Sequence, residues 1–177
     1  MRQLVLAVLA AGTLLGSGCV FMQNSYVENA EFDLELPKPA APARRLRLGV
    51  FKNLSCSDRR FLTRGAEGEL SPSEYLRWRM APELLLQRCM YGAFTVDSEG
   101  EAAAPLLNAV IYRFEFDARS RTAHLGVDFT LRRSGGGRVV RADVSEPVAK
   151  WDSGAARAAA MNRCAARAVA ELAGALK

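Results

Sequence analysis

Three consecutive segments in the second half of the chain alternate between apolar and polar side chains. Such alternation places one kind of side chain on each face of a β-strand. A Ser-Gly-Gly-Gly turn at 134–137 joins the last two segments. The pattern predicts an antiparallel three-strand meander with one apolar face. Its expected apolar positions are Val110, Tyr112, Phe114 and Phe116, then Leu125, Val127, Phe129 and Leu131, then Val140, Ala142 and Val144.

Shorter alternating segments earlier in the chain predict further strands. The alternating apolar positions are Phe32 and Leu34, then Leu46, Leu48 and Val50, then Leu76, Trp78 and Met80, then Phe94 and Val96. Between the second and third of these, residues 52–71 are charged and irregular, and we expect them to form a long loop.

Two segments carry helix signals. Pro82 and Glu83 suit a first helical turn, Leu84 to Met90 continue it, and Gly92 suits its end. Asp152 and Ser153 can cap a long Ala-rich helix that runs to Leu176. Together the elements predict an α+β fold: an antiparallel β-sheet of about five to six strands with two helices packed on one face.

The N-terminus has the layout of an export signal. Arg2 precedes an apolar run from Leu4 to Leu15, which is too short to span a bilayer and is followed by Gly16-Ser17-Gly18. Cys19 then resembles the lipid-attachment cysteine of a bacterial lipobox, although Gly16 stands where Leu is usual. The alternative is an ordinary secreted protein. The expected organisation is a signal peptide at 1–18, a lipid anchor and tether at 19–30, and one domain at 31–177.

Composition narrows the class of protein. Of the 177 residues, 50% are hydrophobic and 24% are charged, which is typical of a globular domain. The formal net charge is +5, but no dense Lys/Arg block interleaved with aromatic residues occurs. A nucleic-acid-binding function is therefore not expected, whereas a basic face could meet anionic lipid or an acidic partner.

The cysteines leave two alternatives open. Once Cys19 is acylated, Cys56, Cys89 and Cys164 remain. Cys89 and Cys164 both fall in predicted helices, and we favour this pair for a disulfide in an oxidising compartment. Three unpaired buried cysteines are the other alternative. No CxxC or Cys/His cluster is present, so we expect no metal site.

The chain carries no convincing catalytic constellation. Its single histidine, His124, falls on the expected polar face of a strand, where a solvated side chain is the usual case. Four carboxylates, Glu115, Asp117, Asp128 and Asp143, are expected on outward faces, which is the ordinary pattern for a half-covered sheet. We therefore predict a protein that is not an enzyme and needs no cofactor.

The segment from Tyr75 to Arg79 is a candidate partner interface. Trp and Arg side chains contribute disproportionately to interface energies, and Tyr75, Arg77, Trp78 and Arg79 lie close together here. The alternative is that Trp78 belongs to the core and the two arginines are solvated.

The chain as a whole resembles a known family. The carrying elements are the lipobox, the strands at Phe32-Asp33-Leu34 and 46–50, the segment 59–64, the Tyr75-Leu76-Arg77-Trp78 stretch before a Leu-rich helix, the meander, and the Ala-rich last helix. In this order they resemble the ABC-type transport auxiliary lipoproteins, the PqiC-like outer-membrane lipoproteins.

The resemblance implies a non-catalytic accessory on the periplasmic face of the outer membrane. Its partners would be an MCE-domain protein and an ABC permease and ATPase that move lipid between the membranes. Whether the domain itself binds phospholipid or forms a homo-oligomer stays open. Two other classes also stay open: an assembly or secretion lipoprotein that escorts a β-barrel or secretin, and an envelope hydrolase.

Overall fold

The structure is a computed structural model that describes residues 28–37, 45–97, 104–133 and 135–176. Its strands are β1 (Ala30–Phe32), β2 (Arg45–Asn53), β3 (Arg60–Arg64), β4 (Leu70–Trp78), β5 (Thr95–Val96), β6 (Leu106–Asp117), β7 (Thr122–Arg133) and β8 (Gly136–Pro147). Its helices are α2 (Pro82–Ala93) and α3 (Gly154–Ala175).

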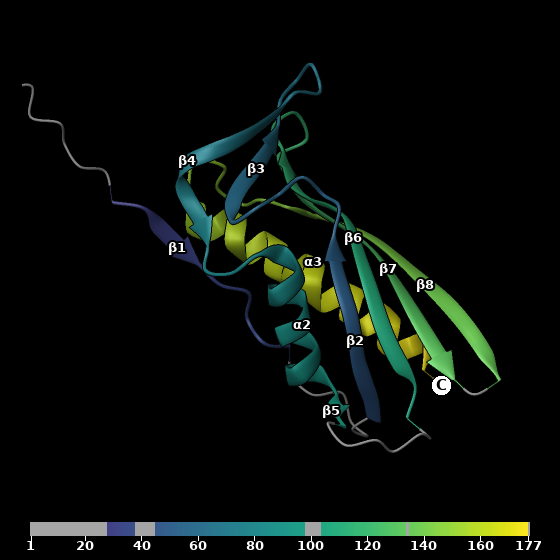
Figure 1. Ribbon diagram of the computed structural model, residues 1–177. Coiled ribbons are helices and arrows are strands. Elements are labelled where there is room, and N and C mark those ends of the chain that lie inside the picture. The colour runs from purple at the N-terminus through teal and green to yellow at the C-terminus, as the bar shows by residue number, and fades with distance from the viewer. Residues whose placement is uncertain (1–27, 38–44, 98–103, 134, 177) are drawn as a thin grey trace, which may run out of the picture.

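The sheet branches at its central strand, β6. β7 pairs antiparallel along the full length of β6, and β8 pairs antiparallel with β7. On the other side of β6, β2 pairs parallel with the first half of the strand and β3 pairs parallel with its end. One branch therefore continues from β2 to β5, and the other from β3 to β4 and β1 (Figure 1).

Both helices pack on the same face of this sheet. α3 contacts β7 and β8, α2 contacts β2, β5 and β6, and the two helices contact each other. The side chains that the strands send to this face are fully buried and apolar, among them Leu107, Ile111, Leu125, Val127 and Phe129. The core thus lies between the sheet and a layer of two helices.

Small side chains let α3 lie close to the sheet. Half of its buried positions are alanine, and the others are Met161, Cys164, Val169 and Leu172. At its start, the Ser153 side chain accepts a hydrogen bond from the Ala156 N–H at 3.2 Å, as expected for an N-cap. α2 instead begins at Pro82, whose missing N–H costs nothing in a first turn.

The α+β class, the two helices on one face and the C-terminal meander are confirmed. The prediction of an antiparallel sheet was wrong for its first half, because β2 and β3 both run parallel to β6. Alternation of side chains indicates a strand but not the direction in which it runs. The sequence pattern therefore could not distinguish parallel from antiparallel pairing. Within the described residues there are eight strands, more than the expected five to six.

The predicted loop at 52–71 was also wrong. It contains β3, and Phe61 and Leu62 of that strand are buried. The strand has only five residues and a charged residue at each end, so its two buried positions do not form a recognisable alternation.

Candidate functional site

One face of the sheet is covered by no described helix, and we call it the open face. It carries the side chains that alternate with the buried ones, and most of them are polar or charged. Among them are Asn108, Val110, Tyr112, Arg113 and Glu115 of β6, His124, Asp128 and Thr130 of β7, and Arg141 and Asp143 of β8.

A bulge in β2 turns an apolar residue onto the open face. Between Leu48 and Phe51 the register of β2 with β6 slips, so Gly49 and Val50 together oppose Asn108. The Asn108 Oδ1 accepts a hydrogen bond from the Val50 N–H at 2.7 Å and occupies the space above Gly49. Val50, expected in the core, is consequently 58% exposed.

A second bulge places an aromatic ring on the open face. The register of β6 with β7 shifts between Ile111 and Arg113, leaving Tyr112 as the extra residue. The Tyr112 ring lies over Gly126, where any Cβ would overlap it. The guanidinium of Arg141 lies above this ring, 5.6 Å from its centroid. The glycine is thus required by the close approach of the ring.

Two shallow hollows meet on the open face at Val110. One, of about 410 Å³, is lined by Leu54, Val110, Tyr112, Asp128, Arg141 and Asp143. The other, of about 330 Å³, is lined by Val50, Lys52, Asn108, Ala109, Val110, Thr130 and Arg132. We call the pair the open-face groove.

The groove combines an apolar floor with charged walls. Val50 and Leu54 are well exposed, Leu54 by 66%. Beside them Arg141 donates two hydrogen bonds to the Asp128 carboxylate, each 2.7 Å long. An apolar strip with ordered charges at its rim is the usual composition of a protein-binding surface.

The alternation along the sequence did not predict this groove, because it placed Val50, Val110 and Tyr112 on the apolar face. A signal was present: Ala109, Val110 and Ile111 are apolar at three successive positions. Such a run is incompatible with one simple alternation, and it indicates a strand with apolar residues on both faces.

A buried carboxylate anchors the other end of the open face. Glu115 is 2% exposed and accepts two hydrogen bonds from Arg64, at 2.8 and 2.9 Å, and one from Arg113 at 2.9 Å. Burial raises the pKa of this carboxyl, but the two guanidinium groups outweigh burial and hold its pKa below the usual range. The side chain is therefore a charged structural link between β3 and β6, not a proton donor.

His124 lies beside this cluster, on the open face as expected. Its Nε2 lies 2.6 Å from the Thr122 hydroxyl, which lies 2.6 Å from that of Ser120. Burial and the nearby Arg113 lower the pKa of His124. In the described part of the chain no carboxylate hydrogen-bonds the other ring nitrogen, so the triad arrangement of a hydrolase is not assembled here.

Trp78 is not part of any surface. It is fully buried, and its ring lies 4.4 Å from that of Phe61 and 5.2 Å from that of Phe114. Phe116 and Phe32 complete this aromatic cluster, whose members come from β1, β3, β4 and β6. Including Trp78 in the candidate interface was wrong, because alternation along β4 turns it toward the core.

The other three members of that candidate interface remain accessible. Tyr75 is 46% exposed and Arg79 is exposed. Arg77 is half-buried and lines a hollow of about 330 Å³ with Asp58, Arg59 and Arg60. Because Arg59 also binds Glu31 and Arg60 binds Asp58, these charges are largely compensated.

The predicted disulfide is not formed. Cys89 and Cys164 are free and buried, on α2 and α3 respectively. In the core, the Cys164 thiol donates to the Ala123 carbonyl oxygen of β7, with the sulfur 3.4 Å from that oxygen. Burial raises the pKa of both thiols to about 12. They act as small core residues, and Cys56 is exposed.

Cys19 and the leader lie outside the described residues. None of the helices that the structure describes has the length and apolar character needed to cross a membrane. Within the described ranges, no three Cys, His, Asp or Glu side chains are grouped so that they could hold a metal ion.

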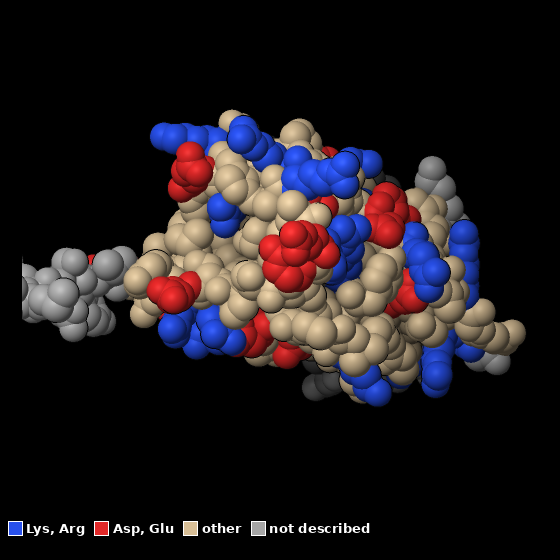
Figure 2. Space-filling view, turned by 90° about the horizontal axis from the view of Figure 1, so that it is seen from above, with Lys and Arg blue, Asp and Glu red and all other residues tan. Residues whose placement is uncertain are grey.

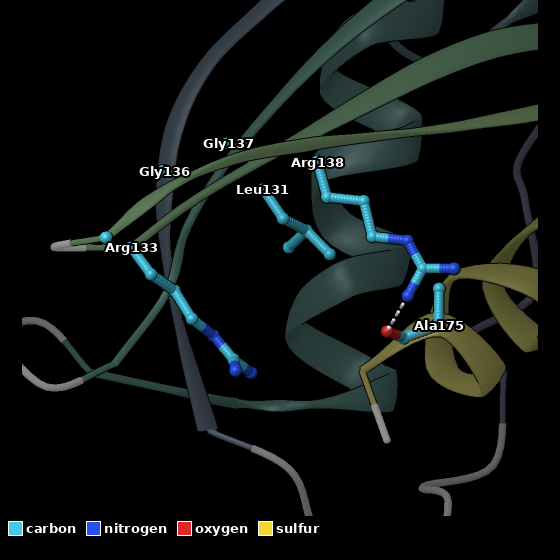
Figure 3. A pocket seen from close by; sticks show the side chains of 7 residues that line it. Leu131, Arg133, Gly136, Gly137, Arg138 and Ala175 are labelled. Carbon is cyan, nitrogen blue, oxygen red and sulfur yellow. Dashed lines mark hydrogen bonds between the residues drawn. The ribbon is translucent and has the colours of Figure 1, made fainter.

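A further hollow, of about 490 Å³, lies between the β7–β8 hairpin tip and the end of α3. It is lined by Leu131, Arg133, Gly135, Gly136, Gly137, Arg138 and Ala175. Figure 3 shows Arg138 reaching across it, and its Nη1 donates to the Ala175 carbonyl oxygen at 3.0 Å. This bond satisfies a carbonyl that the helix end leaves free, so we assign the arginine a structural role.

The charged side chains are mixed on the face seen from above in Figure 2. Blue and red groups alternate there with tan surface between them. The positive net charge of the chain is therefore not concentrated into a single basic field on this face.

Comparisons with known proteins establish the fold. No family model matches the sequence, and no curated protein matches it significantly. Among solved structures, one uncharacterized protein aligns with a TM-score of 0.70 at 11% identity, over 85% of this chain and 99% of its own. Protein XCC0632 from Xanthomonas campestris, of family DUF330, aligns with a TM-score of 0.61 at 20% identity, over 82% of this chain and 93% of its own. The chain shares their fold along nearly its whole described length.

Proposed function

We propose that this protein is a lipoprotein of the outer membrane that faces the periplasm and acts as a docking subunit of an ABC/MCE-type lipid transport system. Cys19 carries the lipid, and the domain contributes contacts without catalysis. The partner is an MCE-domain protein that works with an ABC permease and ATPase.

The observation that carries this proposal is the open-face groove. One face of the sheet is covered by two helices, whereas the other leaves Val50 and Leu54 exposed, with the half-buried Val110 and Tyr112 lining the same two hollows. Leaving such side chains in water costs about 25 cal/mol per Å² of apolar surface, so a partner that covers them gains affinity.

The lining of the groove favours a protein over a lipid as its occupant. The hollows are shallow, and Lys52, Asp128, Arg132, Arg141 and Asp143 line them beside the apolar residues. An acyl chain would leave these charges facing hydrocarbon, whereas a protein edge can offer partners for them.

The test is co-purification of the MCE-domain protein with the full chain from detergent-solubilised membranes. Leu54→Glu, on the open face, is expected to reduce recovery of that partner at least tenfold. Leu84→Glu is the matched control, because Leu84 is also an exposed leucine, 48% accessible, but lies on α2. The control is expected to retain the partner.

Equal recovery with both variants would remove the groove from the proposal. Failure of the parent chain to recover any MCE-domain protein, with recovery of a β-barrel or secretin instead, would replace the proposed function by the assembly role.

The anchor has its own test. Fatty-acid labelling of the parent chain is expected to be lost in Cys19→Ala, and the variant is expected to leave the membrane fraction. Labelling that persists in Cys19→Ala would contradict lipidation at this residue.

A further inference from the structure

β8 forms a long unpaired edge of the sheet. It has 12 residues and pairs with β7, and no other described strand lies against it. Figure 1 shows it as the outermost strand on one side of the molecule. Most of its residues from Gly136 to Asp143 are exposed. Edges of this length usually carry a protective device or pair with another chain.

The direction of the backbone groups along β8 follows from three hydrogen bonds. Val148 donates its N–H to the Arg121 carbonyl at 2.9 Å, so even-numbered residues face the preceding strand. The carbonyl oxygens of Ser145 and Pro147 instead accept from Arg167 and Arg163 of α3. Odd-numbered residues therefore point their N–H and C=O groups away from the sheet.

Arginine side chains from α3 occupy this edge at one end only. They reach the carbonyl oxygens of Ser145 and Pro147, at 3.4 and 2.6 Å. No described side chain is hydrogen-bonded to the outward backbone groups of Val139, Arg141 or Asp143. The middle of the strand is thus free to accept another strand.

The sequence of β8 is complementary to itself when read in the opposite direction. At equal distances before and after Ala142, a positive residue matches a negative one. Arg141 matches Asp143, one residue away on each side, and Arg138 matches Glu146, four residues away. Val140 and Val144 are also placed symmetrically about this centre.

We propose that β8 pairs antiparallel with β8 of a second copy of this chain, about a two-fold axis at Ala142. Arg141 then lies opposite the partner's Asp143, and the symmetry repeats this ion pair. Val139 lies opposite the partner's Ser145 on the same face, and its N–H shares the Ser145 carbonyl oxygen with Arg167, whose own bond to that oxygen is long at 3.4 Å. The two sheets become one continuous sheet, a form of strand addition that needs no change of fold.

The charges select this register over its neighbours. Moving the centre by one residue, to Arg141 or to Asp143, keeps the backbone pairing but places two arginines or two aspartates directly opposite each other. Like charges at opposite positions destabilise a strand pair, whereas opposite charges stabilise it.

The two side chains are ready for this contact. Arg141 uses Nε and Nη2 on Asp128, and its Nη1 has no hydrogen-bond partner among the described residues. Asp143 is exposed and makes no hydrogen bond or ion pair within the described residues. Dimerisation would give Asp143 a partner and satisfy the outward backbone groups of the strand.

Disulfide trapping in membranes tests the register. Two full-length variants, Val139→Cys and Ser145→Cys, are made in a Cys56→Ser background that removes the exposed thiol. Co-expressed with different tags, they are expected to form a cross-linked heterodimer on mild oxidation, because opposite residues in a strand pair meet disulfide distance limits. Either variant alone is expected to remain uncross-linked.

Proline substitution tests the backbone pairing. Val139→Pro removes an N–H that points outward and is expected to raise the dimer dissociation constant at least tenfold, while Val139→Thr changes it by less than threefold. Sedimentation of the full chain in detergent measures both. Asp143→Lys is a second variant that keeps every backbone group. It places a lysine opposite the partner's Arg141 at both symmetric positions, and we expect it to raise the dimer dissociation constant by the same factor.

The proposal is overturned by any of three results. These are a monomeric parent chain at tens of micromolar, a dimer that neither Val139→Pro nor Asp143→Lys weakens, and cross-linking that each single-cysteine variant achieves alone. None of these results depends on the transport partner, so the proposed function and this dimer stand or fall separately.

Discussion

The two faces of the sheet are built from the same strands and have opposite chemistry. The helix-covered face is a dry layer of Leu, Ile, Val and Phe side chains under an Ala-rich helix. The open face holds ion pairs, a half-buried histidine and an apolar strip in between. One face therefore provides the stability of the fold, and the other is available for contacts.

The bulges in β2 and β6 produce this division. Each inserts one residue into a strand and so moves an apolar side chain, Val50 or Tyr112, to the open face. Without them, simple alternation could place Val50 and Tyr112 in the core only by turning Phe51 and Ile111 onto the open face.

The largest difference between substitutions on the two faces, measured as loss of unfolding free energy, is expected at β4. Trp78→Ala empties the centre of the aromatic cluster and should lower the free energy of unfolding by about 3–5 kcal/mol. Tyr75→Ala, on the exposed side of the same strand, should change it by less than about 0.5 kcal/mol. Urea denaturation measures both, and comparable losses would contradict the assignment of Trp78 to the core.

A smaller loss is expected at Glu115. Glu115→Gln leaves Arg64 and Arg113 without their shared carboxylate and should cost about 1–3 kcal/mol at pH 7. Because the folded pKa lies below the ordinary value of 4.5, the charged group stabilises the fold above about pH 4.5, and this stability is lost as the pH falls through the folded pKa.

The difference in unfolding free energy between parent and Glu115→Gln should accordingly narrow below pH 4.5. Glu67→Gln, at an exposed glutamate, is the control and should follow the parent at every pH. A difference that stays constant down to pH 3 would show that the charge of Glu115 contributes nothing.

The contact of Tyr112 with Gly126 gives a prediction of similar or smaller size. Gly126→Ala should destabilise the fold by about 1–3 kcal/mol, because the new methyl group displaces the ring. Gly174→Ala, in α3 with open space around it, should be neutral or slightly stabilising. In a Tyr112→Ala background the cost of Gly126→Ala should fall, and thermal unfolding of the four chains tests this.

The thiols should report the covered face without changing stability. Cys56 is expected to react with a thiol reagent in the native protein, whereas Cys89 and Cys164 react only after unfolding. Burial raises the pKa of both to about 12, so little thiolate is present at pH 7. If they stay unreactive in denaturant without reductant, they are paired in a disulfide after all.

Much of the fold was accessible from the sequence. Ser153 and Pro82 predicted the helix starts, and the alternation in β7 and β8 predicted which side chains are buried. These features depend on residues close together in the sequence, so local sequence patterns can predict them. Strand β3 was missed because only Phe61 and Leu62 are buried in a short charged stretch.

The candidate site was much less accessible. The interface prediction at Tyr75 to Arg79 included a core tryptophan, and the groove was not predicted. Val50 reaches the open face because Asn108, 58 residues away in sequence, accepts its backbone N–H. Contacts at such separation leave no mark on local periodicity.

The sequence by itself determined the elements, the covered face of the meander and the charge pattern of β8, because each depends on the spacing of side chains along one strand or helix. Only the tertiary structure decided the direction of β2 and β3, the positions of the bulges and the free edge at β8. These depend on which distant backbone groups hydrogen-bond to each other, and alternation of side chains is the same for every such choice.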